Sequence, residues 1–287
     1  MAARLIDGKA LAQQVRDRLA KESAELLALK GVKPGLATIL VGDDPASHIY
    51  VKNKQKACEL AGIYVDDHKL PAATTQAELL ALIEKKNADP RIHGILVQLP
   101  LPNHIDSKVI LEAVSPLKDA DGFHPVNLKL FFKGKGAIQP VFPEAIMKLI
   151  KSVPKKYYLN KKAIILANSR KFGEVMEKML AGEKIKGKYI LAPSFFSALS
   201  LKKKEVLKAD IIISALGRSG IIKGGLIKRG TVIIDGGIIK KGRRILGNVD
   251  SSSVEKAASY LTPVPGGVGP VTVATLMENV YKLAKNK

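Results

Sequence analysis

The sequence contains one cysteine, no tryptophan and only 5% aromatic residues among its 287 positions. The single thiol, Cys58, excludes an internal disulfide and any metal site built from several cysteines. The five histidines show none of the close spacings, such as two histidines four residues apart, that mark a metal-binding helix. We therefore expect no metal site, and we interpret Cys58 as a buried structural thiol.

Long apolar runs are also missing. The longest lie around Ile211–Ile213 and Val232–Ile234, far below the roughly 18 residues that a membrane helix needs. The first residues reach Asp7 before an apolar segment develops, which is atypical of a secretory signal. With 46% hydrophobic and 25% charged residues, the composition is that of a globular protein. These features predict a cytoplasmic protein with no membrane partner.

Acidic residues are scarce relative to basic ones: 47 lysines and arginines face 26 acids, for a formal charge of +21. Such a charge favours anionic partners, including nucleic acids and small phosphates or polycarboxylates. The basic residues are dispersed between apolar segments, however, and no RNA-binding pattern of interleaved aromatics accompanies them. We interpret them as a solvated basic surface and expect no nucleic-acid partner.

The first half of the chain alternates short apolar runs with helix-length polar segments. This alternation predicts a parallel sheet covered by helices, and hence an α/β fold. Asp7 is a candidate N-cap, and Thr75 and Glu78 form a candidate capping box. The expected elements are helices from Asp7 to Leu29, from Pro45–Ser47 to Ala61 and from Thr75 to Asn87, and strands over Leu36–Val41 and Gly94–Leu99.

The stretch Lys118–Pro143 is rich in glycine and proline, so we expect irregular structure and a domain boundary there. Four apolar runs beyond it predict a small doubly wound, Rossmann-like sheet that binds a dinucleotide. The loop Thr262–Pro270 is too rich in glycine and proline for regular structure, and an apolar helix follows from about Val273. The four runs are Ala163–Leu166, Tyr189–Leu191, Asp210–Ala215 and Thr231–Asp235. The expected domains are residues 1–140, completed by helix 270–287, and residues 141–269.

Three polar side chains of the second expected helix share one face. Ser47, Tyr50 and Lys54 follow one another at helical spacing, which places an aromatic surface beside an amine. That combination suits a flat heteroaromatic substrate that exchanges a proton, although a surface lysine and a half-buried tyrosine also fit. Gln98 ends an apolar strand, at the edge where parallel sheets bind ligands. The loop Asp119–Pro125 carries two carboxylates, which a plain turn would also explain.

Four longer motifs stand in order along the chain, at Val41–Ala57, Gly94–Pro102, Lys118–Asn127 and Thr262–Thr272. Together they resemble the methylenetetrahydrofolate dehydrogenase/methenyltetrahydrofolate cyclohydrolase family, over essentially the whole sequence. The resemblance implies a folate-site domain completed by the C-terminal helix, a Rossmann-like domain across a cleft, and a homodimer. It also implies an enzyme that oxidises methylenetetrahydrofolate with NADP, or with NAD, and hydrolyses the methenyl product to formyltetrahydrofolate.

The resemblance assigns roles to single residues. Lys54 matches the catalytic lysine, whose ordinary pKa of about 10.4 must be depressed by burial and by the substrate cation. Gln98 would orient that amine, Tyr50 would stack on the folate, and Asp121 would accept hydrogen bonds from the pteridine. The implied substrate-binding residues are Ser47, Tyr50, Val97, Gln98, Leu99, Asp121, Pro265, Gly266 and Gly267.

The coenzyme motif departs from the family pattern. Where the family usually reads Gly-Arg-Ser after the first strand, this chain has Ala167-Asn168-Ser169. An arginine typically holds the ribose phosphate of NADP. Arg170 or Lys171 would have to replace it, so we expect weak NADP binding. The implied coenzyme-binding residues are Ala167, Asn168, Ser169, Arg170, Ser194, Gly217 and Ile238.

Two further motifs differ from the family. The usual His-Ser-Lys/Arg-Thr reads Pro193-Ser194-Phe195-Phe196, and the usual Gly-Asp-Val reads Gly247-Asn248-Val249. The loop Gly217–Gly220 follows a strand and could touch the dinucleotide or form an ordinary turn. Two alternatives therefore stay open: a cyclohydrolase alone with a degenerate coenzyme site, and a basic nucleic-acid-binding protein on the same scaffold.

Overall fold

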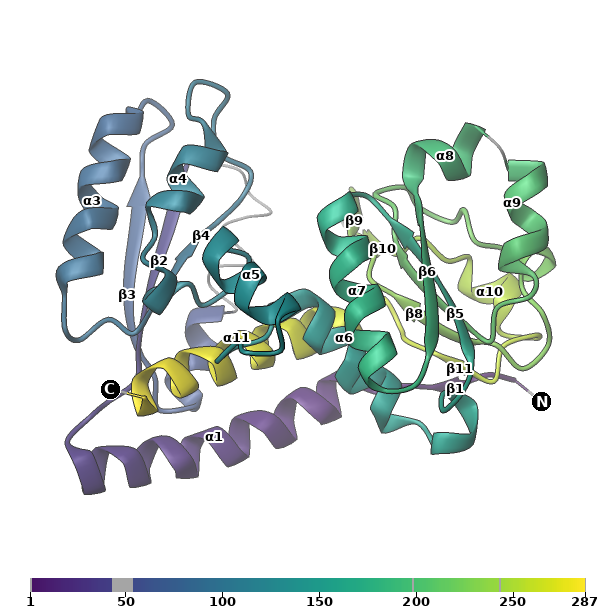
Figure 1. Cartoon of the computed structure of the whole chain (residues 1–287), viewed down its shortest axis with the longest axis horizontal. Coiled ribbons are helices and arrows are strands. Elements are labelled where there is room, and N and C mark those ends of the chain that lie inside the picture. Colours follow the sequence, from purple (N-terminus) through teal and green to yellow (C-terminus); the bar gives the residue numbers. More distant parts are fainter. Residues whose placement is uncertain (1, 43–53, 198, 243, 287) are drawn as a thin grey trace. The chain divides into compact units, whose positions relative to one another are not determined.

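The computed structural model describes residues 2–42, 54–197, 199–242 and 244–286, which form two compact units (Figure 1). The three-stranded unit comprises residues 13–141 and 273–287, and the six-stranded unit comprises residues 1–12 and 142–272. Each name refers to the parallel sheet that the described residues of that unit form. The α/β class predicted from the sequence is thereby confirmed.

The sheet of the three-stranded unit is centred on β2 (Gly35–Val41), which is buried along its whole length. β3 (Tyr64–Leu70) and β4 (Gly94–Val97) pair with β2 on either side and run parallel to it. The carboxyl ends of the strands therefore meet at one edge. α3 (Gln76–Ala88) packs its buried side chains into one cluster with β2 and β4. The other described elements of this unit are helical residues 54–60, α4 (Ser107–Ala113), the short helix η1 (Pro116–Lys118) and α5 (Pro125–Phe132).

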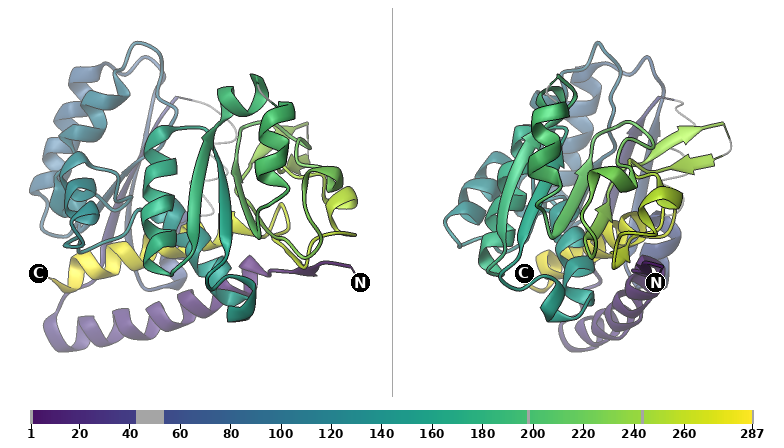
Figure 2. Two further views of the ribbon diagram at one scale, coloured as in Figure 1. Left: turned by 45° about the vertical axis from the view of Figure 1, so that its right-hand side comes forward. Right: turned by 90° about the vertical axis from the view of Figure 1, so that its right-hand side faces the viewer.

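Two long helices, α1 (Gly8–Lys30) and α11 (Val268–Lys285), contribute residues to both units. The carboxylate of Asp7 caps α1, because its Oδ1 accepts hydrogen bonds from the backbone of the second and third helical residues. Within the three-stranded unit the two helices lie side by side (Figure 2), joined by an ion pair between Arg18 and Glu278.

The sheet of the six-stranded unit has the order β1-β11-β8-β7-β5-β6, with every pair parallel. The strands β5, β7 and β8 are almost continuously apolar and buried, as expected of parallel strands covered on both faces. The strands are β1 (Arg4–Leu5), β5 (Lys162–Ala167), β6 (Lys186–Leu191), β7 (Ile211–Ala215), β8 (Val232–Asp235) and β11 (Tyr260–Leu261). The other elements are α6 (Val141–Ser152), η2 (Lys155–Tyr157), α7 (Arg170–Gly182), α8 (Ala192–Ser197), α9 (Leu199–Val206), η3 (Gly224–Leu226), α10 (Ser251–Val254) and the hairpin β9 (Ile239–Lys241) and β10 (Arg244–Leu246).

The expected domain limits differ from the observed units at the amino terminus. Residues 1–12 belong to the six-stranded unit, because β1 pairs with β11 there. A strand of two residues carries too little pattern to be recognised in a sequence. At the other limits, Val141 and residues 273–287 belong to the three-stranded unit.

Several local expectations were wrong. The stretch 118–143 was expected to be irregular, but it contains α5. This helix begins at Pro125, because proline is well tolerated at the first helical position, and the side chain of His124 caps it. α11 begins at Val268, earlier than Val273, and accommodates Pro270 in its first turn. β4 ends at Val97 instead of Leu99. The edge strand β3 was not recognised, because its sequence is mostly polar.

Candidate functional site

Gln98 follows the carboxyl end of β4 and has a fixed side-chain orientation. Its backbone N–H donates to the carbonyl of Ile39 at 2.8 Å, which extends the pairing with β2 by one residue. Its Nε2 donates to the carbonyl of Leu99 at 2.8 Å, so Oε1 is the atom left to face the helix that contains Lys54. Val97 is buried and Leu99 is 44% exposed, so only the latter presents a large apolar surface beside the amide.

Lys54 begins the described helical segment 54–60 and is 9% exposed. Its Nζ donates a hydrogen bond to Oε1 of Gln98 at 2.9 Å. Burial lowers the pKa of Lys54, and the charges of Asp121 and the Cys58 thiol partly oppose that shift. A lysine in this setting carries a larger neutral fraction at neutral pH than an exposed one, as a proton acceptor requires.

The loop that carries Asp119 and Asp121 runs beside β4. Ile95 and Asp119 form a parallel bridge, so the chain at Asp121 has advanced toward the same sheet edge as Gln98. The carboxylate of Asp119 accepts backbone hydrogen bonds from Gly122 at 3.0 Å and from His124 at 2.8 Å. Asp119 is thus a structural residue that shapes the loop.

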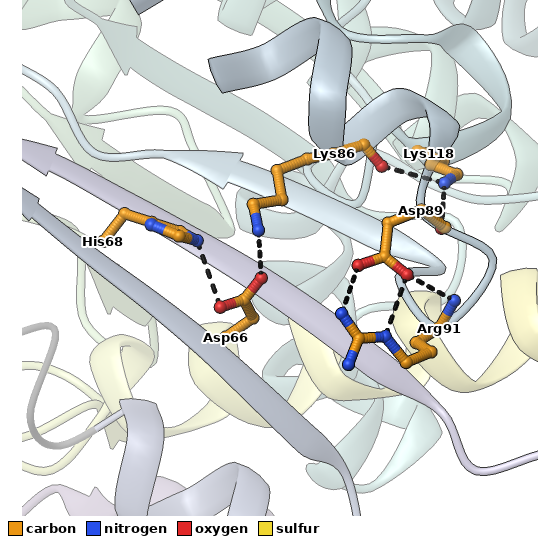
Figure 3. Close-up of polar contacts among 6 residues, drawn as sticks. All are labelled: Asp66, His68, Lys86, Asp89, Arg91 and Lys118. Carbon is orange, nitrogen blue, oxygen red and sulfur yellow. Dashed lines mark hydrogen bonds and ion pairs between the residues drawn. The ribbon is translucent and has the colours of Figure 1, made fainter.

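Lys118 attaches this loop to the carboxyl end of α3 (Figure 3). Its buried Nζ donates to the carbonyl oxygens of Lys86 at 2.9 Å and of Asp89 at 2.7 Å, at the helix end where backbone carbonyls lack intrahelical partners. α3 is in turn held to β3 by an ion pair of 2.6 Å between Lys86 and Asp66. The position of the loop is therefore fixed by its attachment to α3, which is in turn attached to β3.

Asp121 has a different environment from Asp119. Within the part of the chain that the structure describes, no hydrogen bond reaches its carboxylate, whereas its carbonyl accepts one from Val141 at 3.0 Å. Burial raises the pKa of Asp121 to about 6; the charge of Asp119 raises it further and that of Lys54 opposes the shift. A partly buried carboxylate without a donor is suited to bind one from a ligand.

α11 is hydrogen-bonded to the same loop through Asn279. Nδ2 of Asn279, buried in that helix, donates to the carbonyl of Ala120 at 3.0 Å and to that of Gln139 at 2.8 Å. Gly94 of β4 permits the close approach, because a Cβ there would lie 2.9 Å from both Ala120 and Val280. Asn279 was not identified from the sequence, since nothing near it in the chain indicates its distant partners.

The three-stranded unit thus combines a buried amine, an amide that orients it and a carboxylate without a described donor. This set can accept and return a proton next to a bound polar heterocycle. Ser47 and Tyr50, expected in the same site, lie outside the described residues. Cys58 is fully buried, and burial raises the pKa of its thiol to about 12, which leaves it unreactive at neutral pH.

The coenzyme residues implied by the sequence occupy one edge of the six-stranded sheet. Asn168 and Ser169 follow β5, Ser194 follows β6, Gly217 follows β7 and Ile238 follows β8. These strands are neighbours and parallel, so their carboxyl ends lie at the same edge of the sheet. Ala167, the last residue of β5, is buried. Pro265, Gly266 and Gly267 belong to the same unit, in the loop that leads into α11.

The turn after β5 starts α7. The hydroxyl of Ser169 caps this helix by accepting a hydrogen bond from the N–H of Phe172 at 3.3 Å, and Arg170 is its first residue. Asn168, Arg170 and Lys171 are exposed. A helix amino terminus with hydroxyl and cationic side chains suits an anionic dinucleotide, so these residues fit NADP chemically.

A buried polar network shapes the loops after β7 and β8. The carboxylate of Asp235 accepts hydrogen bonds from the backbone of Gly237, Asn248 and Val249 at 2.9 to 3.0 Å. The side chain of Asn248 accepts one from the N–H of Leu216 at 3.0 Å and is fully buried. The sequence marked Asn248 only as a departure from the family motif, and its partners were unknown.

Among the described residues, no group of three or more histidine, cysteine, aspartate or glutamate side chains could hold a metal ion. Within the same ranges, no helix has both the length and the apolar character needed to cross a membrane.

Comparison with known proteins covers nearly the whole chain. Residues 6–121 match the family model of the tetrahydrofolate dehydrogenase/cyclohydrolase catalytic domain, and residues 140–287 match that of the corresponding NAD(P)-binding domain. A bifunctional protein FolD from Magnetococcus marinus is 45% identical over 286 residues, which is 99% of this chain and 98% of that protein. One from Methanosarcina mazei is also 45% identical, over 98% of this chain and 96% of that protein.

Solved structures agree with the sequence relatives. The FolD enzyme of Campylobacter jejuni has a TM-score of 0.91 at 42% identity and covers 99% of both chains. The Trypanosoma brucei enzyme, solved with NADP and an inhibitor, has a TM-score of 0.92 at 34% identity and covers 100% of this chain and 98% of that one. The resemblance recognised in the sequence is confirmed: the chain belongs to the tetrahydrofolate dehydrogenase/cyclohydrolase family.

Proposed function

We propose that this protein oxidises methylenetetrahydrofolate with NADP and hydrolyses the methenyl product to formyltetrahydrofolate, with Lys54, Gln98 and Asp121 acting on the folate. The dehydrogenase/cyclohydrolase function follows from family membership along the whole chain. The assignment of these three residues is supported chiefly by the hydrogen bond of 2.9 Å between Nζ of Lys54 and Oε1 of Gln98.

The hydrolysis needs a proton acceptor beside a cationic substrate. Water adds to the methenyl carbon and one of its protons passes to Nζ of neutral Lys54. Lys54 returns that proton to the ring nitrogen as the C–N bond breaks, and the hydroxyl proton is released to solvent as the formyl carbonyl forms. Burial favours the neutral amine, and the positive charge of the substrate favours it further. Oε1 of Gln98 accepts a hydrogen bond from one N–H of that amine, so the nitrogen lone pair points away from Gln98.

Binding and orientation of the folate depend on the remaining residues. The carboxylate of Asp121 would accept hydrogen bonds from the N–H donors of the pteridine, and Tyr50 would stack on the ring with Ser47 nearby. Bound NADP would supply the hydride acceptor for oxidation of the one-carbon bridge. Asn168, Ser169, Arg170, Ser194, Gly217 and Ile238 would hold it at the edge of the six-stranded sheet, where ligands of such sheets bind.

Two spectroscopic assays with purified protein test this proposal. Loss of methenyltetrahydrofolate absorbance above the uncatalysed rate reports hydrolysis, and formation of NADPH from methylenetetrahydrofolate reports oxidation. If the protein hydrolyses methenyltetrahydrofolate but neither NADP nor NAD supports oxidation of methylenetetrahydrofolate, it is a cyclohydrolase without dehydrogenase activity. The uncharged Asn168 in the coenzyme motif is the reason to test for this outcome. If neither reaction is detected and the protein binds RNA tightly in a salt-dependent manner, the nucleic-acid alternative suggested by the charge of +21 is favoured.

We further propose that the protein acts as a homodimer in the cytoplasm. The support is its family membership for the dimer and the single cysteine for a reducing compartment. Light scattering during size-exclusion chromatography should give twice the chain mass of 30.9 kDa. A single-chain mass at micromolar concentration would contradict the dimer.

A further inference from the structure

The uncharged Asn168 leaves open which cation would bind the extra phosphate of NADP. Phe195 and Phe196, after β6, also stand where the family usually has a basic residue and a threonine. A dianionic phosphomonoester in a protein site needs charge-assisted hydrogen bonds, for which a guanidinium is the most suitable donor. The candidates for this role are Arg170 and Lys171 in the turn after β5, and an arginine from a neighbouring loop at the same sheet edge.

Arg218 is placed at that edge by the loop after β7. Its Cζ lies 4.2 Å from the centre of the Phe196 ring, in the helix that follows β6. In the sheet, β5 lies between β7 and β6. A contact between the residues that follow β7 and β6 therefore passes over the carboxyl end of β5, next to the Asn168 turn.

The backbone of Arg218 is held in place. Nδ2 of Asn248 donates to its carbonyl at 2.7 Å, and Gly217 before it has a φ of +68°, a value that favours glycine. Asn248 is itself fixed by its backbone bond of 3.0 Å to Asp235. Asparagine is needed here, since an ionised aspartate could not donate to the Arg218 carbonyl.

The stacking leaves the hydrogen-bonding capacity of Arg218 available. A guanidinium that lies flat on an aromatic ring uses its face, while its N–H groups point outward in the plane. Arg218 is exposed, and within the described ranges it has no carboxylate partner. A planar donor set with one side supported by a ring can bind a phosphate bidentately.

We propose that Arg218 determines the coenzyme specificity, by binding the ribose 2′-phosphate of NADP in place of the arginine that Asn168 lacks. This inference rests on the NADP-dependent step of the proposed function. It differs from the expectation that Arg170 or Lys171 fills the role. Phe196 acts as a positioning residue that keeps the guanidinium over the end of β5.

The test is a set of binding titrations with purified full-length protein, using NADP, NAD, 2′,5′-ADP and 5′-AMP. We expect Arg218→Ala to weaken NADP and 2′,5′-ADP about 10- to 100-fold, because a charged hydrogen-bond partner is lost, and to change NAD and 5′-AMP less than about twofold. Arg218→Lys, which keeps the charge without the planar fork, should recover part of the loss. Phe196→Leu should give an intermediate, NADP-selective loss.

Arg229→Ala is the matched control, because Arg229 is exposed and precedes β8 at the opposite edge of the same sheet. Equal weakening of NADP and NAD in Arg218→Ala would show a structural role and overturn the inference. An unchanged ratio of NADP affinity to NAD affinity in Arg218→Ala would also overturn the inference. The same holds if only Arg170→Ala loses NADP affinity. If the wild type binds neither nucleotide, the inference fails, and the methenyltetrahydrofolate assay decides separately whether the hydrolytic function stands.

Discussion

Asp119 and Asp121 lie two residues apart in one loop, yet their carboxylates have opposite environments. That of Asp119 accepts hydrogen bonds from its own loop and from Asn127 at 2.9 Å. Among the described residues, none is donated to that of Asp121. The first carboxylate therefore stabilises the fold, whereas the second is kept available at an energetic cost, as is common in binding sites.

This contrast predicts opposite effects of the same substitution on stability. The pKa of Asp121 is raised to about 6 in the folded protein, so its ionisation opposes folding as the pH rises through the range from 3.8 to 6. We expect Asp121→Asn to raise the free energy of unfolding by about 1–2 kcal/mol at pH 8 and by much less at pH 4. Asp119→Asn should lower it by about 1–3 kcal/mol, because backbone donors lose a charged acceptor.

Urea unfolding of both variants and the wild type at pH 4 and pH 8 measures these differences. A destabilised Asp121→Asn protein at pH 8 would mean that this carboxylate serves the fold.

The same group predicts how folate affinity varies with pH. Only the ionised carboxylate of Asp121 accepts hydrogen bonds from both donors of a pteridine, so affinity should fall as the pH drops below about 6. The decrease approaches about tenfold per pH unit at most. Titration with a deaza-pteridine analogue, whose ring does not itself titrate in this range, gives the dissociation constant from pH 5 to pH 8. The Asp121→Asn variant should bind weakly at every pH, and a flat wild-type profile would contradict the assignment.

Lys54→Met should reduce hydrolysis of methenyltetrahydrofolate about 100- to 10,000-fold, the usual contribution of a general acid–base group. Folate binding should persist, because methionine has nearly the same shape as the neutral side chain. Lys56→Met is the control, since Lys56 is exposed on the same helix two residues further on. Normal hydrolysis by the Lys54 variant would remove this amine from the mechanism.

Gln98→Glu tests whether the neighbouring amide controls the amine. A carboxylate in hydrogen-bond contact with Nζ of Lys54 would favour the charged amine and raise its pKa. We expect the pH at which hydrolysis reaches half of its maximum to increase by about 1–2 units, with a loss of rate at neutral pH. Gln55→Glu adds the same charge one residue along the helix from Lys54, and its profile should shift much less.

Asn168→Arg should tighten NADP and leave NAD nearly unchanged, because it adds a guanidinium at the position where the family has one. The gain is about 10-fold or more if the new side chain reaches the phosphate, as expected for a charge-assisted bond. Asn286→Arg adds the same charge at the exposed C-terminal end and should change neither affinity. A wild type that already prefers NADP a thousandfold would contradict the weak binding expected from Asn168.

Local sequence signals predicted much of the secondary structure. The capping box of Thr75 and Glu78 is present, with bonds in both directions, and Asp7 caps α1. The buried strands β2 and β7 were recognised because their apolar runs are continuous. The signals failed for β3, because its sequence is mostly polar and its Asp66 pairs with Lys86 of α3, 20 positions away, a contact that no neighbouring position reveals.

The candidate site was predicted unevenly. Lys54, Gln98 and Asp121 were identified because long motifs resemble a family, and motifs preserve residue identity along the chain. The bond between Lys54 and Gln98, 44 positions apart, requires the helix that contains Lys54 to pack beside the end of β4. Asn279 and Asn248 were not assigned a role, since their partners are far away in sequence.

The sequence by itself determined the α/β class, the caps of single helices and the family, because these depend on residues within a few positions or on whole motifs. Only the tertiary structure decided which of two neighbouring aspartates is left for a ligand, and which arginine lies over the Phe196 ring after β6. Both outcomes depend on strand register and helix packing, such as the bridge between Ile95 and Asp119, which bring distant segments to one edge of a sheet. Contacts of that kind are set by the packing of the whole fold and are absent from any local pattern.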